Sequence, residues 1–411
     1  MAAGNPRHGT PSLAVFGAVP RFSRQLHVGA PNVVDPEAFI QRLRRIFDRN
    51  RLTNGGPEER ELEQVIAERV GVRHCIAVVN ATTALQILCR ALDWHGQVIV
   101  PSFTFVGTAH ALAWLGIQPV FCDVDPDTHN IDPRLVEDLI TERTTGILGV
   151  HLWGRPCDVD ALQRIATERK LDLVFDAAHA WGCSSGSTPI GRFGRAEVFS
   201  FHATKWVHAF EGGAIATDDD ELAKRCAAIK RFGFVGYDRT STLGINGTMS
   251  EAAAAMGLVS LKTEGPILQR NRANFEAYAE GLRRLPGVRI VQPTAENRWH
   301  YHYVVLEIDE TVAPLHRDLL QRVLWEERVL ARRYFYPGCH RLEPYRGVGT
   351  HRPLPVTERL AHRTLALPTG LQMEPHEAAS VCELVHTAFE HAAAVRKGLP
   401  ELPPIEWHEP A

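Results

Sequence analysis

The segment Cys75–Val100, "CIAVVNATTALQILCRALDWHGQVIV", carries the clearest secondary-structure pattern of the chain. It begins with an apolar, β-branched run, Cys75–Val79, which is typical of a buried strand. Apolar residues then recur at helical spacing through Thr83–Leu92, and Val98–Val100 is a second short β-branched run. A strand, a helix and another strand in this order predict two parallel strands joined by a helical crossover.

The same alternation continues towards residue 217. Further strands are expected at Val120–Asp123, Gly146–His151, Leu171–Phe175, Glu197–Phe201 and Ala214–Thr217, with helices at Gly107–Leu115 and Ala161–Arg169. We therefore predict an α/β fold with a mainly parallel, seven-stranded sheet that is covered by helices on both faces. In open sheets of this kind, ligands bind at the carboxyl ends of the strands.

The chain of 411 residues is too long for one simple core, and we predict three parts. Residues 1–30 form an N-terminal arm, of which 1–20 is small, polar and expected to be loose. Residues 31–285 form the large domain and include a long helical stretch from Ser250 that is interrupted near Gly265. After residue 285 the pattern changes, which predicts a smaller C-terminal α+β domain at 286–411.

The composition excludes several classes of function. A hydrophobic content of 45%, a charged content of 23% and a net charge of -3 describe an ordinary soluble protein without a nucleic-acid partner. No run is long and apolar enough for a membrane span and the start resembles no secretory signal, so we expect a cytoplasmic protein. The eight cysteines lack C-x-x-C spacing and no H-E-x-x-H is present, so we predict no metal site.

One lysine lies in an almost uncharged segment, Phe199–Gly213, "FSFHATKWVHAFEGG". The chain has six lysines and thirty-nine arginines, so Lys205 is not an arbitrary choice of cation. A desolvated lysine loses its proton readily and forms imines with carbonyl groups, which arginine does not. A surface lysine is the alternative, but the apolar neighbours and the close backbone approach that Gly212 and Gly213 permit argue against it.

Two other predicted strands are followed directly by residues that are typical of functional sites. The sequence Asn80–Leu85, "NATTAL", opens a helix, and its Thr82 and Thr83 are N-cap residue types. A helix N-terminus with free N–H groups suits a phosphate, although an ordinary capped helix would look the same. Asp176 directly follows an apolar predicted strand. A carboxylate at this position must either pair with a cation or cap the start of the next helix.

A phosphate cradle, a carboxylate for a pyridine nitrogen and an imine-forming lysine are the groups that pyridoxal 5'-phosphate requires. We therefore predict this cofactor, with Lys205 and Asp176 as the catalytic residues.

The motifs "NATTAL", "FDAAHAWGC", "FSFHATKWVHAFEGG" and "GINGTMSEAAAAMGL" together resemble the nucleotide-sugar aminotransferases of the DegT/DnrJ/EryC1/StrS family. The resemblance implies an aspartate aminotransferase-like fold (fold type I), a homodimer, and L-glutamate as amino donor. It also implies that His179 contacts the cofactor's ring hydroxyl. The other implied cofactor contacts are Ala81, Thr82 and Ser200 at the phosphate, Phe105 stacked on the ring, and Asn246 reaching the phosphate from the neighbouring subunit. The chain departs from many members at Gly247–Thr248, where they have Tyr-Arg or Tyr-Lys.

The substrate is indicated by resemblance alone. The motifs "HLWGRPCD" (His151–Asp158) and "ARRYFYPGCHRLEPY" (Ala331–Tyr345) are most similar to enzymes that aminate C4 of TDP-4-keto-6-deoxyglucose for deoxysugar biosynthesis. The candidate sugar-binding residues are Thr53, Asn54, Gly55, Trp206, Tyr334 and His340, for which a turn or core packing is the alternative.

Other functions remain open at this point. One is a C3 aminotransferase for a TDP-3-keto-6-deoxy sugar, and another is a non-catalytic pathway regulator that binds the cofactor. Dehydratases with this fold resemble the same pattern but have histidine where this chain has Lys205. A dinucleotide-dependent dehydrogenase would require G-x-G-x-x-G after a strand, and the chain has none.

Overall fold

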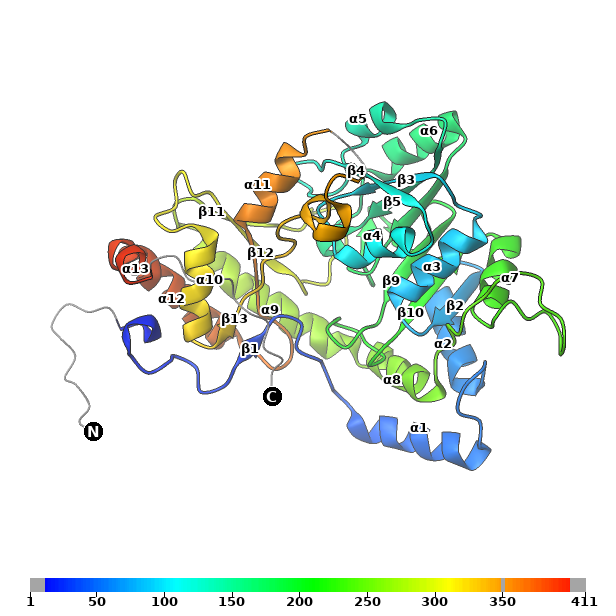
Figure 1. Ribbon diagram of the computed structural model, residues 1–411. Helices are drawn as coiled ribbons and strands as arrows, with labels where there is room; N and C mark the ends of the chain where they lie inside the picture. Colours follow the sequence, from blue (N-terminus) through cyan, green and yellow to red (C-terminus); the bar gives the residue numbers. More distant parts are fainter. Residues whose placement is uncertain (1–11, 349–351, 400–411) are drawn as a thin grey trace.

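The computed structural model describes residues 12–348 and 352–399, which form two groups of secondary structure around two sheets (Figure 1). The larger sheet has seven strands in the order β2-β10-β9-β6-β5-β3-β4. They are β2 (His74–Val78), β3 (Gln97–Pro101), β4 (Gln118–Cys122), β5 (Thr144–Val150), β6 (Asp172–Asp176), β9 (Ala196–Ser200) and β10 (Gly213–Thr217). Strand β10 runs antiparallel to both neighbours, and the other pairings are parallel, as predicted.

Helices cover both faces of this sheet. One face carries α3 (Ala81–Ala91), α4 (Val106–Ala113) and α7 (Asp220–Ile229), and the other carries α2 (Pro57–Val70), α5 (Pro133–Val136), α6 (Val159–Arg169) and α8 (Glu251–Lys262). In β3, Val98 and Val100 pack towards α3 and α4, while Ile99 packs towards α6. Burial of alternate residues on opposite faces explains the unbroken apolar runs of the sequence. Helix α1 (Pro36–Arg49) projects from the body beside α8 (Figure 1).

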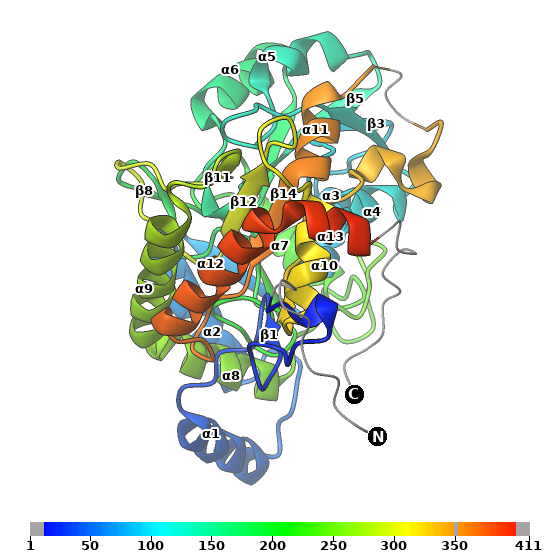
Figure 2. The same cartoon turned by 90° about the vertical axis from the view of Figure 1, so that its left-hand side faces the viewer.

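The second sheet lies in the C-terminal part and is antiparallel, in the order β11-β12-β14. Its strands are β11 (Val288–Ile290), β12 (Val304–Ile308) and β14 (Thr364–Leu367). The helices around it are α9 (Glu264–Leu282), α10 (Arg317–Glu326), α11 (Pro355–Arg363), α12 (Pro375–Glu390) and α13 (Ala392–Gly398), which Figure 2 shows from the side. The long helical stretch predicted from Ser250 is two helices, α8 and α9, which meet at Thr263.

The expectation that residues 1–20 are loose is wrong for residues 13–20, and residues 1–11 lie outside the described part of the chain. Leu13 and Leu26 are buried in the C-terminal core. The backbone N–H groups of Ala14 and Arg21 donate to the carboxylate of Glu327, at 2.7 and 2.6 Å. Strand β1 (Leu26–His27) also pairs in parallel with β13 (Val329–Leu330). Apolar anchors and satisfied backbone groups thus fix a segment that is poor in strong local signals.

The C-terminal part is tied across the carboxyl ends of β3 and β4. Asp123, directly after β4, accepts the N–H groups of Val356 and Thr357 at the start of α11, at 2.9 and 2.7 Å. After β3, the carbonyl of Ser102 accepts the N–H of Cys339 at 2.9 Å. These contacts place residues 331–348 and 352–361 over the edge of the large sheet where ligands are expected. The division between residues 285 and 286 stays a prediction.

Candidate active site

A cavity of about 380 Å³ lies at the carboxyl ends of the large sheet. Its floor comes from the ends of β6 and β9 and the start of α3, and its other walls come from the C-terminal part and the N-terminal segment. The lining includes the predicted residues Ala81, Thr82, Phe105, Asp176, His179, Ser200, Lys205 and Tyr334. Residues from distant parts of the sequence therefore meet in one cavity.

Lys205 enters the cavity from the turn after β9. Its Nζ donates a hydrogen bond to the hydroxyl of Tyr303 at 3.2 Å. Burial lowers the pKa of the amine to about 8, and the charge of Asp176 opposes this shift. An amine with this pKa is partly unprotonated near neutral pH, as a nucleophile or a proton acceptor must be.

Asp176, the last residue of β6, is 6% exposed. One carboxylate oxygen accepts the N–H of Ala178 at 3.0 Å and the other accepts the hydroxyl of Thr108 at 2.8 Å. Burial raises the pKa of this carboxyl, and these two hydrogen bonds and the charge of Lys205 oppose the rise. A carboxylate offers about four lone-pair sites, so Asp176 has capacity for a further donor such as a protonated ring nitrogen.

The helix start at α3 has the geometry of an anion site. Its N-cap is Asn80, whose side chain accepts the N–H of Thr83 at 2.8 Å, so the cap precedes the two threonines that the sequence singled out. Ala81 and Thr82 follow in the first turn and line the cavity beside Ser200 at the end of β9. The N–H groups of a first turn have no partner within their helix, which suits a phosphate.

Gly213 permits this arrangement because it lies directly behind the helix start. A Cβ at residue 213 would meet the backbone carbon of Asn80 at 2.5 Å and the backbone nitrogen of Ala81 at 2.6 Å. The close backbone approach predicted for the glycine pair is therefore present at this position.

His179 forms one wall of the cavity. Its ring stacks on Tyr303, with 4.3 Å between centroids, and on Trp153, with 5.6 Å. Burial lowers its pKa well below the ordinary value, so the ring is neutral. Its Nδ1 is buried and has no hydrogen-bond partner within the part of the chain that is described. A buried polar atom of this kind indicates a missing ligand group, such as a ring hydroxyl.

Phe105 lines the cavity as the N-cap residue of α4, and its side chain is 58% exposed. An aromatic ring that is this exposed at a cavity wall is available to stack on a planar ligand.

These residues fit pyridoxal phosphate. The start of α3 with Ser200 suits its phosphate, Asp176 suits its ring nitrogen and the orphaned Nδ1 of His179 suits its ring hydroxyl. Lys205 suits its aldehyde because its amine is partly unprotonated.

Several predicted residues lie outside this cavity. Trp206 is a core residue whose indole N–H donates to the carbonyl of Trp181 at 3.1 Å. His340 is held between the hydroxyl of Ser102, at 2.7 Å, and the carboxylate of Glu358, at 3.3 Å. Both arrangements agree with packing, the alternative considered for these side chains, and only Tyr334 of the predicted aromatic sugar contacts lines the cavity.

Asn246 and the turn Thr53–Gly55 lie close to each other on a separate surface. Arg231 forms a β-bridge with Asn246. A Cβ built on Gly55 would lie 2.5 Å from a guanidinium nitrogen of Arg231. Asn246, Thr53 and Asn54 are exposed, and none of them lines the cavity of its own chain.

The sequence interpretation missed several cavity residues, of which the most informative are Tyr303, Thr108 and Arg332. Tyr303 ends the run Trp299–Tyr303, "WHYHY", directly before β12. A run of rings with polar atoms before an apolar strand was a usable signal, because such rings need partners when they are buried. Thr108 and Arg332 gave no comparable signal.

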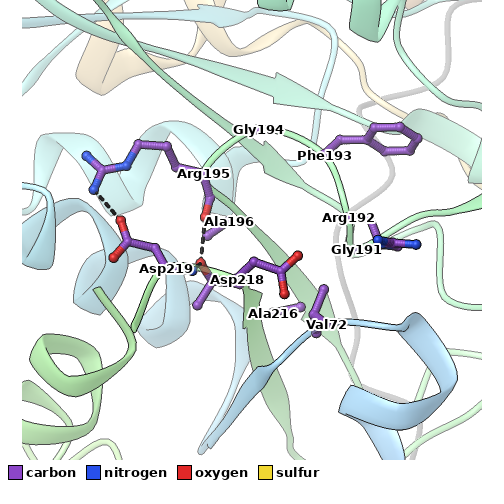
Figure 3. A pocket seen from close by; sticks show the side chains of 11 residues that line it. Val72, Gly191, Arg192, Phe193, Gly194, Arg195, Ala196, Ala216, Asp218 and Asp219 are labelled. Carbon is purple, nitrogen blue, oxygen red and sulfur yellow. Dashed lines mark hydrogen bonds and ion pairs between the residues drawn. The ribbon is translucent and has the colours of Figure 1, made fainter. Parts of the chain in front are cut away.

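A second hollow, of about 250 Å³, lies at the opposite end of the strands (Figure 3). It is lined by residues 191–196 before and at the start of β9 and by 216–219 at the end of β10. In it, Arg195 pairs with Asp219 at 2.6 Å. None of the predicted cofactor residues lies there, so the chemistry is assigned to the first cavity.

Across residues 12–348 and 352–399, no helix is long and apolar enough to cross a membrane. The same residues contain no group of three or more metal-ligating side chains.

Comparison with known proteins identifies relatives of this chain. A relative from Shigella dysenteriae, described as dTDP-4-amino-4,6-dideoxy-D-glucose transaminase, is 37% identical over 351 residues, which cover 85% of this chain and 95% of the relative. An Escherichia coli relative of the same description is 35% identical over 350 residues, covering 84% and 94%. The crystal structure of DesI in the presence of its TDP-sugar product has a TM-score of 0.91 and 48% identity, covering 94% of this chain and 98% of that one.

The family described as the DegT/DnrJ/EryC1/StrS aminotransferases matches residues 34–386. The predictions of fold type I, of pyridoxal phosphate as cofactor and of an aminotransferase are confirmed. The chain belongs to the DegT/DnrJ/EryC1/StrS aminotransferase family.

Proposed function

We propose that this enzyme transfers an amino group from L-glutamate to C4 of TDP-4-keto-6-deoxyglucose and forms TDP-4-amino-4,6-dideoxyglucose. The observation that supports the chemistry is the Lys205 amine, whose pKa is lowered to about 8 by burial against the opposing charge of Asp176. The choice of sugar is supported by the descriptions of the two relatives and of DesI, which name a dideoxy amino sugar and a TDP-sugar product.

Each part of the cavity has its own role in the proposed reaction. In its neutral form, Lys205 accepts a proton from the reacting carbon, and as an ammonium group it returns the proton. Asp176 holds the ring nitrogen in its protonated form, and the start of α3 anchors the phosphate. The bound cofactor supplies a ring that withdraws electrons from the carbon that loses its proton. The rings of Tyr303 and Phe335, which line the cavity and pack on the buried Trp153, exclude water from this step.

We also propose a homodimer in which each subunit completes the cavity of its neighbour. The support is the position of Asn246, Thr53 and Asn54, which are exposed and lie outside the cavity of their own chain. Exposed apolar side chains lie next to these residues in the sequence. Leu52 precedes Thr53 and is 52% exposed, and between Arg231 and Asn246 the exposed fractions are 53% for Phe232, 76% for Leu243 and 40% for Ile245. An exposed apolar patch rimmed by polar groups is typical of a protein interface. A cytoplasmic location remains part of the proposal.

A single-turnover experiment tests the substrate. The enzyme is converted with glutamate to its amine-loaded form, the donor is removed, and TDP-4-keto-6-deoxyglucose is added while the cofactor absorbance is followed. We expect the original absorbance to return and NMR to place nitrogen at C4 of the sugar. Return only with a 3-keto isomer would move the enzyme to C3 amination, and no return with either sugar would contradict the proposal.

A further inference from the structure

The contact between Lys205 and Tyr303 joins the two halves of the molecule inside the cavity. Lys205 follows β9 of the large sheet, while Tyr303 directly precedes β12 of the C-terminal sheet. Their polar atoms are 3.2 Å apart, and Nζ lies 5.9 Å from the centroid of the tyrosine ring. The hydroxyl of Tyr303 is therefore placed to orient the amine.

Packing fixes the position of this hydroxyl. The Tyr303 side chain is 6% exposed, and its ring stacks on His179 with 4.3 Å between centroids and packs at an angle against Trp153 with 5.6 Å between centroids. Trp153 is held in turn, because its indole N–H donates to Nδ1 of His129 at 3.2 Å. Burial raises the pKa of Tyr303 well above its ordinary value, so the side chain keeps its proton at neutral pH.

We propose that Tyr303 is a positioning residue for the aminotransferase reaction, whose hydroxyl fixes the Lys205 amine in the cavity and favours its protonated form. This inference rests on the proposed role of Lys205. A hydrogen bond from an ammonium group to a hydroxyl is charge-assisted, and it is stronger than the bond from a phenol to a neutral amine. The hydroxyl therefore counteracts burial when Lys205 must hold a proton.

Several other charged and titratable groups surround Lys205. Asp176 at the end of β6 raises the pKa of the amine, and His179, His300 and His302 have pKa values that burial lowers, so they carry no charge at neutral pH. His202, Glu211 and Arg332 also line the cavity. All of these groups are unchanged when Tyr303 loses its hydroxyl, so a shift in the pKa of Lys205 would report the hydroxyl alone.

The test compares full-length Tyr303→Phe with Tyr334→Phe as a matched control. Tyr334 lines the same cavity and stacks on Phe335 and Trp153, with centroids 5.0 and 6.0 Å apart. After removal of the cofactor, the pH dependence of acylation of Lys205 by a lysine-selective reagent is followed by peptide mass spectrometry. We expect the pKa of Lys205 to fall by about one unit in Tyr303→Phe and to stay unchanged in Tyr334→Phe.

Protein prepared with 3-fluorotyrosine gives a second measurement that keeps the ring packing. The fluorinated phenol is a weaker acceptor, so it must lower the same pKa by a smaller amount. In the holoenzyme, Tyr303→Phe should lower kcat for the glutamate half-reaction and shift its pH profile while KM for glutamate stays within about twofold.

An unchanged pKa in folded Tyr303→Phe, or equal shifts in both variants, would overturn the inference. That result differs from a failure of the proposed function, in which wild-type Lys205 would not carry the cofactor.

Discussion

Lys205 and Asp176 face one cavity from the ends of the adjacent strands β9 and β6, and burial lowers the pKa of the amine to about 8 against the charge of the carboxylate. The parallel pairing of these strands brings their carboxyl ends to the same edge of the sheet. The fold thus sets a buried amine of lowered pKa and a buried carboxylate in the same cavity, as the proposed reaction requires.

The first prediction concerns Asp176. Asp176→Asn keeps an oxygen for the N–H of Ala178 but loses the charge that holds a ring nitrogen protonated. We expect the glutamate half-reaction to slow at least about a hundredfold while the cofactor still binds. Thr108→Val is the matched comparison, since it removes one hydrogen bond to the same carboxylate, and it should cost about tenfold. Equal rates for Asp176→Asn and wild type, measured by stopped-flow absorbance, would refute the assigned role.

The second prediction concerns pH and stability in cofactor-free protein. The pKa of Lys205 is about 8 in the folded chain against 10.5 for the free side chain. Between these values the unfolded chain binds more protons, so this group makes stability rise with pH across that window. Below pH 8 the buried ammonium group of Lys205 lowers the free energy of unfolding by its full amount. Lys205→Met removes this destabilisation.

The quantity to compare is the Tm of Lys205→Met minus the Tm of wild type. We expect this difference to be about 2–4 °C larger at pH 7 than at pH 10.5. Lys224→Met serves as the control, because Lys224 is an exposed lysine paired with Glu221 at 2.7 Å. Thermal denaturation at a series of pH values gives the comparison. A Tm difference that does not change with pH would mean that the amine is not desolvated.

The third prediction concerns the phosphate cradle. In Gly213→Ala the new methyl group would press on the backbone of Asn80 and Ala81 and displace the start of α3. We expect the Kd for pyridoxal phosphate to rise at least about tenfold, measured by fluorescence titration. Gly265→Ala is the control because a Cβ there meets nothing within 4 Å. Wild-type affinity in folded Gly213→Ala would show that the phosphate binds elsewhere.

The fourth prediction concerns the shared active site. Lys205→Ala and Asn246→Ala should each be nearly inactive as homodimers. When the two chains are co-expressed, random pairing makes about half of the dimers mixed, and one of the two sites in each mixed dimer is intact. We expect about a quarter of wild-type activity to return. Activity no higher than the average of the two parents would contradict a site built from two subunits.

The sequence predicted the large sheet well for a physical reason. Strands that are buried on both faces, such as β3 and β6, appear as unbroken apolar runs, and Asp176 stands out because a charge ends such a run. Lys205 stands out because this chain otherwise prefers arginine. These signals are local and need no knowledge of distant contacts.

The contacts that the sequence did not reveal are long-range. Tyr303 meets Lys205 across 98 positions, and Ala14 meets Glu327 across 313. Local patterns do not report such pairs, and the segment around Ala14 therefore looked loose. The N-cap of α3 was misplaced for a different reason, since Asn80, Thr82 and Thr83 are all capable caps and the backbone geometry selects Asn80.

Reduction of the holoenzyme with borohydride, followed by peptide mass spectrometry, would show which lysine holds the cofactor. Borohydride fixes the cofactor permanently to the lysine that binds it. We expect one modified peptide, which contains Lys205, and no modification at the other five lysines. A modification at any other lysine, or none in cofactor-loaded protein, would refute the role of Lys205.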